Sequence, residues 1–108
     1  MELKDSNWSE LEKKVAKSAL DKSRKRESAA LIEMVRNRAK EITKLDDLWY
    51  LHDFLSARRY DLDGKYDEEG LGFIFVLAGL VKDGWLDSAD LEGLETDKLK
   101  KIKALTLM

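Results

Sequence analysis

The sequence predicts an all-α fold, in which a long amino-terminal helix and a compact helical carboxyl-terminal part form a helical homodimer. Proline is absent, and the first glycine is Gly64, so nothing in the backbone chemistry of residues 1–63 interrupts a helix. Apolar residues recur there at helical spacing. With 44% hydrophobic and 39% charged residues, the chain has enough apolar surface for a core, and its charge favours a core shared between subunits.

The first helix is predicted to run from about residue 8 to residue 44. Asn7 followed by Glu10 matches a capping box, which would start the helix near Trp8. The apolar positions form two patches, separated by the sequence DKSRKRES at residues 21–28, which contains none. Because two turns without an apolar side chain offer nothing to a hydrophobic interior, we expect the helix to project from the body of the protein there.

The second helix is predicted over residues 47–63, capped by Asp46 and Asp47 and ended by Gly64 in a left-handed conformation. A helical head over about residues 67–106 completes a single all-helical domain that spans residues 1–108, because 108 residues is the size of one ordinary domain.

Within the head, a third helix is predicted to start at the acidic turn of residues 67–69 and to stop at Gly84, although its apolar run FIFVL is also typical of a strand. Short helices capped by Ser88 and Thr96 would follow.

Composition and charge narrow the classes of function. The chain has no cysteine, which fits a reducing cytoplasm, and no apolar run near the roughly 20 residues that cross a bilayer, so we expect a soluble protein without membrane insertion. Residues 12–40 carry ten basic and four acidic side chains, whereas residues 46–97 carry four basic and fourteen acidic. This asymmetry suits a basic helix beside an acidic neighbour in a dimer. The acidic pI disfavours the alternative, a nucleic-acid-binding dimer that uses Lys13–Arg26.

The sequence predicts no enzyme, and neither a cofactor nor a metal. His52 is the one histidine, and the chain lacks the GxSxG, HExxH and glycine-rich phosphate-binding motifs. The sequence DLDGKYDEEG resembles a calcium loop, but placing Gly64 at loop position six puts Arg59 at position one, where a carboxylate is needed.

The segment from Asp46 to Asp67 separates into two faces on a helical wheel. An arc of about 120° has the pattern of a core-facing stripe, and it contains Leu48, Leu51, Phe54, Leu55 and Leu62. The far side, an arc of about 60°, contains Trp49, Asp53, Ser56 and Tyr60, with His52 and Arg59 at its edge. Aromatic rings interleaved with charges are typical of a protein interface. A dimer interface, packing against the first helix and scattered exposure remain alternatives.

Two further residues are candidates for a second contact with a partner. Phe75 points about 100° away from Ile74, toward glycines, and is therefore either exposed or buried under a neighbouring helix. Lys101 belongs to a basic cluster near the end of the chain that would suit an acidic partner, or is simply a solvated helix face.

The sequence WYLHDFLSARRYDLDGKYD, followed by GFIFVLAGLVKDG and the ending KIKAL, resembles the fluorescence recovery protein family of cyanobacteria. The resemblance implies an all-helical homodimer that binds the photoactivated red form of the orange carotenoid protein, mainly through that partner's C-terminal domain. Such a protein speeds the partner's return to the orange form and its detachment from the phycobilisome. Non-photochemical quenching then ends and fluorescence recovers.

The same resemblance assigns site residues and a location. The family's functional surface combines Trp, His, Asp and Arg, and these types fall on Trp49, His52, Asp53 and Arg59. The implied location is the cytoplasm, near the thylakoid face that carries phycobilisomes. The alternative function is a helical dimeric adaptor that binds another protein through the Trp49 face.

Overall fold

The computed structural model describes residues 8–66 and 72–108. In chain order the elements are α1 (Glu10–Ala39), α2 (Leu45–Lys65), α4 (Phe73–Lys82), the short 3-10 helix η2 (Ser88–Leu91) and α5 (Thr96–Thr106). The described residues contain no strand, so the predicted all-α fold with a long amino-terminal helix is confirmed, and the run FIFVL is helical.

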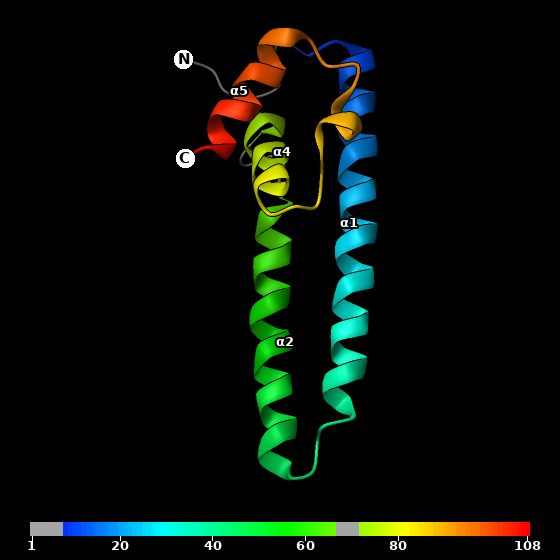
Figure 1. Ribbon diagram of the computed structural model, residues 1–108, viewed down its shortest axis with the longest axis vertical. Coiled ribbons are helices and arrows are strands. Elements are labelled where there is room, and N and C mark those ends of the chain that lie inside the picture. The colour runs from blue at the N-terminus through cyan, green and yellow to red at the C-terminus, as the bar shows by residue number, and fades with distance from the viewer. Residues whose placement is uncertain (1–7, 67–71) are drawn as a thin grey trace.

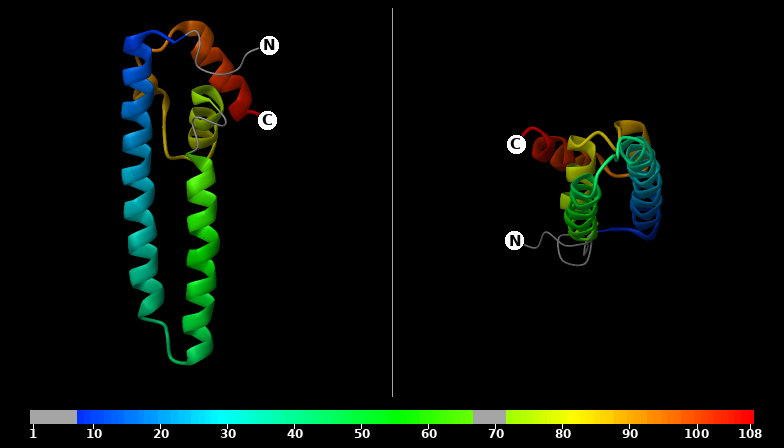
Figure 2. Two further views of the ribbon diagram at one scale, coloured as in Figure 1. Left: turned by 180° about the vertical axis from the view of Figure 1, so that it is seen from behind. Right: turned by 90° about the horizontal axis from the view of Figure 1, so that it is seen from below.

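The helices α1 and α2 lie side by side and antiparallel, and form a stem with the connecting turn at one end and a small head at the other (Figure 1). The longest dimension of the molecule is 53 Å. Figure 2 shows that α4 lies beyond the end of α2 along the long axis and runs back toward it, so that Asp83 at the end of α4 meets Lys65 of α2, while α5 packs beside α4 at the head. Helix α1 alone passes through both the stem and the head.

The ends of α1 and α2 differ from the sequence prediction by a few residues. Helix α1 is capped by Ser9, whose hydroxyl accepts from the backbone N–H of Glu12 while the Glu12 carboxylate accepts from that of Ser9. This capping box lies two residues beyond the expected one. At the turn, the Asp47 carboxylate accepts from the backbone N–H groups of Thr43 and Lys44. These bonds favour an extended Lys44 as the start of α2, so α1 ends before residue 44.

Glycine ends a helix at one of the two expected places. Helix α2 continues through Gly64 to Lys65, and Gly64 is not among the glycines with positive φ, so that part of the prediction is wrong. Helix α4 ends as expected: Gly84 has φ of 87°, and the N–H groups of Gly84 and Trp85 bond to the carbonyls of Val81 and Leu80. This is a Schellman motif, which satisfies carbonyls that the helix leaves free. The predicted start of this helix at residues 67–69 lies outside the described residues.

The hydrophobic core lies in the head and along the first half of α1. Its largest fully enclosed members are Leu77 and Leu80 of α4, each with 0% exposure. Trp8 closes the core, with its ring centroid 5.2 Å from that of Phe73. The buried apolar residues are Trp8, Ala16, Ala19, Leu20, Tyr66, Phe73, Ile74, Val76, Leu77, Ala78, Leu80, Leu86, Leu91, Leu94 and Ile102.

The sequence predicts that the polar stretch at residues 21–28 projects from the body of the protein, and this prediction is wrong. Ser23 and Glu27 are among the most enclosed side chains, with 0% and 1% exposure. They pack through hydrogen bonds to α2 and Tyr66 rather than through apolar contact. Beyond Glu27, α1 has no buried residue, and α2 has none at all. The stem is therefore only half-buried on its inner side.

Candidate interaction surface

One side of α2 carries the residues that the sequence singled out, and we refer to Trp49, His52, Asp53, Arg59 and Tyr60 together as the Trp49 surface. All five are exposed, and Trp49 and Tyr60 keep 53% and 82% of their surface in contact with solvent. Large exposed aromatic side chains on a helix face are typical of a site that binds another protein.

Three of the five residues of the Trp49 surface are in contact with one another. The rings of Trp49 and His52 meet edge to face, with centroids 6.0 Å apart and an interplanar angle of 89°. The Nδ1 atom of His52 lies 3.2 Å from Oδ1 of Asp53. Arg59 takes no part in the ion pairs that link described residues, so its guanidinium is available to a carboxylate on another molecule.

The opposite side of α2 faces α1 but is less buried than a core stripe. Leu51, Phe54, Leu55 and Leu62 are half-buried, whereas Leu48 is 44% exposed. The guanidinium carbon of Arg38 lies 4.6 Å from the centroid of the Phe54 ring and covers part of it. Two helices alone enclose too little volume to bury a stripe of leucines. The helical wheel therefore predicts correctly which side of α2 faces α1, but overestimates how deeply that side is buried.

The candidates for a second contact lie in the head, on α4 and α5. Phe75 is 38% exposed, which decides in favour of exposure over burial under a neighbouring helix. Lys101 is exposed, as are Lys100 and Lys103, whereas Lys98 of the same cluster is buried against Glu12. Because the head and the middle of α2 are at different levels of the long axis, these residues are not part of the Trp49 surface (Figure 1).

A buried polar junction between α1 and α2 was missed by the sequence reasoning. The Glu27 carboxylate accepts hydrogen bonds from Arg58, Lys65 and Tyr66, at 3.1, 2.9 and 3.1 Å. Since Tyr66 donates its one hydroxyl proton to Glu27, Ser23 donates to the Tyr66 oxygen at 2.8 Å. Burial raises the pKa of the Tyr66 phenol, and the neighbouring Glu27 carboxylate adds to the increase. We call Glu27, Arg58, Lys65 and Tyr66 the Glu27 junction.

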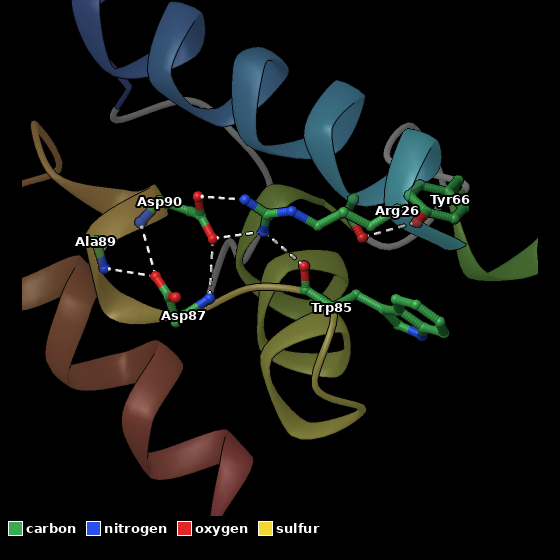
Figure 3. A network of polar contacts seen from close by, with 7 residues as sticks. Arg26, Tyr66, Trp85, Asp87, Ala89 and Asp90 are labelled. Atoms are coloured by element: carbon green, nitrogen blue, oxygen red, sulfur yellow. Dashed lines mark hydrogen bonds and ion pairs between the residues drawn. The ribbon is translucent and has the colours of Figure 1, made fainter. Parts of the chain in front are cut away.

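A second polar cluster fastens α1 to η2 in the head (Figure 3). The Arg26 guanidinium donates to both carboxylate oxygens of Asp90, at 2.8 and 3.1 Å, and to the backbone carbonyl of Trp85 at 2.9 Å. The hydrogen bond from Arg26, together with the backbone N–H of Asp87, lowers the pKa of Asp90 to about 2. The head is therefore held to α1 by charge as well as by the core.

Two further features, a metal site and a helix that could cross a membrane, are absent from the described residues. Residues 8–66 and 72–108 contain no group of three or more His, Asp or Glu side chains placed to hold a metal ion. His52 has Asp53 as a neighbour, but the pair is exposed on a convex helix face. In the same residues, none of the helices combines the length and the apolar character that a bilayer crossing requires.

A half-buried helical hairpin with an exposed aromatic and charged face is typical of proteins that bind other macromolecules. Residues 8–106 match the sequence model of a protein family described as photoprotection regulator fluorescence recovery protein. The chain is 45% identical to the fluorescence recovery protein of Synechocystis sp. PCC 6803 over 101 residues, which are 94% of this chain and 93% of that protein. It therefore belongs to the fluorescence recovery protein family of photoprotection regulators.

Solved structures agree with this assignment. The fluorescence recovery protein of Fremyella diplosiphon superposes with a TM-score of 0.89 at 49% identity, covering 94% of this chain and 100% of that one. The Synechocystis sp. PCC 6803 structure superposes with a TM-score of 0.88 at 44% identity, covering 94% and 99%. The predicted family resemblance is thus confirmed in both sequence and fold.

Proposed function

We propose that this chain binds the photoactivated red form of the orange carotenoid protein, mainly through that partner's C-terminal domain, and accelerates its return to the orange form. The partner would then detach from the phycobilisome, non-photochemical quenching would end, and fluorescence would recover. The proposed site of action is the cytoplasm, next to the thylakoid face that carries phycobilisomes. The observation that carries this proposal is the exposed Trp49 surface, in a family of photoprotection regulators.

The proposed mechanism requires binding alone and no covalent step. A binding protein accelerates a rearrangement only if it stabilises the rearranging state more than the starting state. Trp49 and Tyr60 offer apolar area, and Asp53 and Arg59 offer charges of both signs for orientation. If Phe75 and Lys101 form a second contact, the two sites would hold two partner domains at high effective concentration.

We further propose that the working form is a homodimer. The described part of the stem exposes large apolar residues besides the Trp49 surface, among them Ile32, Leu45 and Leu48. A second copy that covers them would remove apolar area from water at roughly 25 cal/mol per Å². Light scattering on a sizing column tests this: Leu48→Glu should shift the protein to monomer, and a monomeric wild type would contradict it.

The same measurement separates two roles for the Trp49 surface. If Trp49→Ala stays dimeric and loses partner binding, the surface is for the partner. If Trp49→Ala becomes monomeric, the surface belongs to the subunit interface. The matched control is Tyr50→Ala, because Tyr50 is an aromatic residue with 75% exposure, about 100° further around the same helix and outside the Trp49 surface.

The function is tested by the dark back-conversion of photoactivated orange carotenoid protein, followed by absorbance with and without this chain. Acceleration at substoichiometric amounts, reduced by Trp49→Ala and unchanged by Tyr50→Ala, is the expected result. No acceleration by a folded wild-type protein would remove the proposal. The adaptor function would then be the better description, and pull-down specificity would identify its partner.

A further inference from the structure

Helix α2 is held to the rest of the molecule in an unusual way for a helix of 21 residues. None of its side chains is buried, and the apolar ones that face α1 are half-buried. The hydrophobic core ends along α1 at the level of Leu20, and the last buried residue of α1 is Glu27. Apolar packing alone therefore does little to fix how far α2 is rotated about its own axis, because shallow contacts between two helices resemble one another at neighbouring rotations.

Among the described residues, the ion pairs that join α2 to α1 are those of the Glu27 junction. Two cations from α2, Arg58 and Lys65, meet the same oxygen of Glu27, Oε2, at 3.1 and 2.9 Å. The Glu27 side chain is 1% exposed, and those of Arg58 and Lys65 are 28% and 21% exposed. Lys65 also reaches Oδ2 of Asp83, at the end of α4, at 3.2 Å. One carboxylate thus joins two helices, and a shared lysine extends the connection to the head.

The spacing of the two cations gives the junction a geometric consequence. Arg58 and Lys65 are seven residues apart, so they leave α2 within about 20° of each other. On the same wheel they lie about 180° from Trp49. A rotation of α2 would carry both cations away from Glu27 together and would move the Trp49 surface by the same angle.

We infer that Glu27 is a positioning residue: by holding Arg58 and Lys65 it fixes the rotation of α2 and so sets the direction in which the Trp49 surface faces. Charged groups in low-dielectric surroundings contribute little net stability, because desolvation offsets their attraction, and in some proteins they specify one geometry among several of similar packing. Its effect on partner binding rests on the function proposed above, whereas its effect on the rotation of α2 does not.

Distance measurements between spin labels test the inference directly. The chain contains no cysteine, so Asn37→Cys on α1 and Ala57→Cys on α2, both exposed, introduce one label on each helix. Labelled protein is mixed with excess unlabelled protein, so that distances within one chain are read in a dimer. The test variants are Glu27→Gln and the charge-free set Glu27→Leu, Arg58→Leu and Lys65→Met. The control is Asp21→Asn, which removes the exposed Asp21–Lys25 pair of the same helix.

The expected result separates geometry from stability. Wild type and Asp21→Asn should give one narrow distance distribution, and both test variants should give a broader or shifted one. The charge-free set should melt no lower than wild type, because no buried charge is left without a partner, yet it should bind the photoactivated partner at least fivefold more weakly. If the distribution stays narrow and unshifted in both variants, Glu27 does not position α2. The same holds if affinity falls only in variants that melt lower. A wild type that does not act on the orange carotenoid protein removes the proposed function and leaves the distance test unaffected.

Discussion

Replacing Glu12 by Gln should destabilise the protein far more than a change near the start of a helix usually does. Its carboxylate closes the capping box with Ser9, accepts from the backbone N–H of Glu95 at 3.1 Å, and pairs with Lys98 Nζ at 3.1 Å. The side chains of Glu12 and Lys98 are 3% and 6% exposed. Glutamine keeps an acceptor for the backbone groups but removes the carboxylate that pairs with the enclosed Lys98 ammonium.

The expected magnitude follows from that enclosed charge. Removing one partner of a buried ion pair costs about 3–4 kcal/mol. The entropy of unfolding is roughly 2.1 cal/mol/K per residue, or about 0.23 kcal/mol/K for 108 residues, so the melting temperature should fall by about 13–17 °C. The ammonium also lies 5.3 Å from the centroid of the Trp8 ring, a contact that partly stabilises it and favours the lower end of that range.

Thermal melts followed by circular dichroism check this prediction, at one pH and one protomer concentration because dimer formation would make the melting temperature depend on concentration. The double variant Glu12→Gln with Lys98→Met completes a cycle and removes both charges of this pair. It should melt higher than Glu12→Gln alone. If the double variant instead loses the sum of the two single losses, the residues do not act as a pair and the reasoning is refuted.

Three further predictions concern other parts of the molecule. Folding lowers the pKa of Asp90 from 3.8 to about 2, so the stability that its carboxylate contributes is present above about pH 4 and is lost as the pH falls toward 2. Between about pH 4 and pH 2 the melting temperature of Asp90→Asn should therefore fall less than that of wild type. Gly93→Ala should cost about 1–3 kcal/mol, since φ is 108° and the new Cβ would lie 2.8 Å from Cγ2 of Val15; a melting temperature within 2 °C of wild type would contradict this. Trp49→Ala should leave the melting temperature nearly unchanged, whereas Leu77→Ala, at a site with 0% exposure, should lower it by the equivalent of about 3–4 kcal/mol, and equal losses would show that Trp49 packs in the core instead of on the surface.

Much of the fold could be predicted from the sequence because it depends on the conformational preferences of neighbouring residues. The absence of proline and early glycine leaves a helix as the natural state of the first half of the chain, and the described residues follow it through α1 and α2. The exposure of Trp49 and Tyr60 was also readable, because the 100° step of a helix separates them from the leucines of the same segment. The helix ends were less predictable, since Ser9 and Asn7 both match a capping pattern and only the position of the head decides between them.

The burial of polar side chains on α1 could not be predicted from the sequence, for a different reason. A hydrophobic periodicity reports which side of a helix is apolar, and it takes a run such as DKSRKRES for a solvated surface. Ser23 and Glu27 are nevertheless buried, because their partners are 43 residues away at Tyr66 and 31 residues away at Arg58. No local pattern encodes a pairing across that separation. One signal was present: Arg58 and Lys65 interrupt the apolar side of α2 at a spacing of seven, where solvated cations have no reason to lie.

The depth of the stem raises the same question for apolar residues. A helical wheel predicts the direction in which Leu48 points, but not how many atoms cover it. Within the described part of one chain, only α1 covers this side of α2, and Leu48 stays 44% exposed. An apolar stripe that has the pattern of a core but is only half-buried therefore indicates that a covering partner is absent from the single chain, and not that the helical periodicity was assigned wrongly. In this protein the side of α2 that faces α1 and the Trp49 surface both stay incompletely covered. One of them is expected to meet a second copy and the other the photoactivated partner, so a variant that distinguishes the two contacts is more informative than any further measurement of stability.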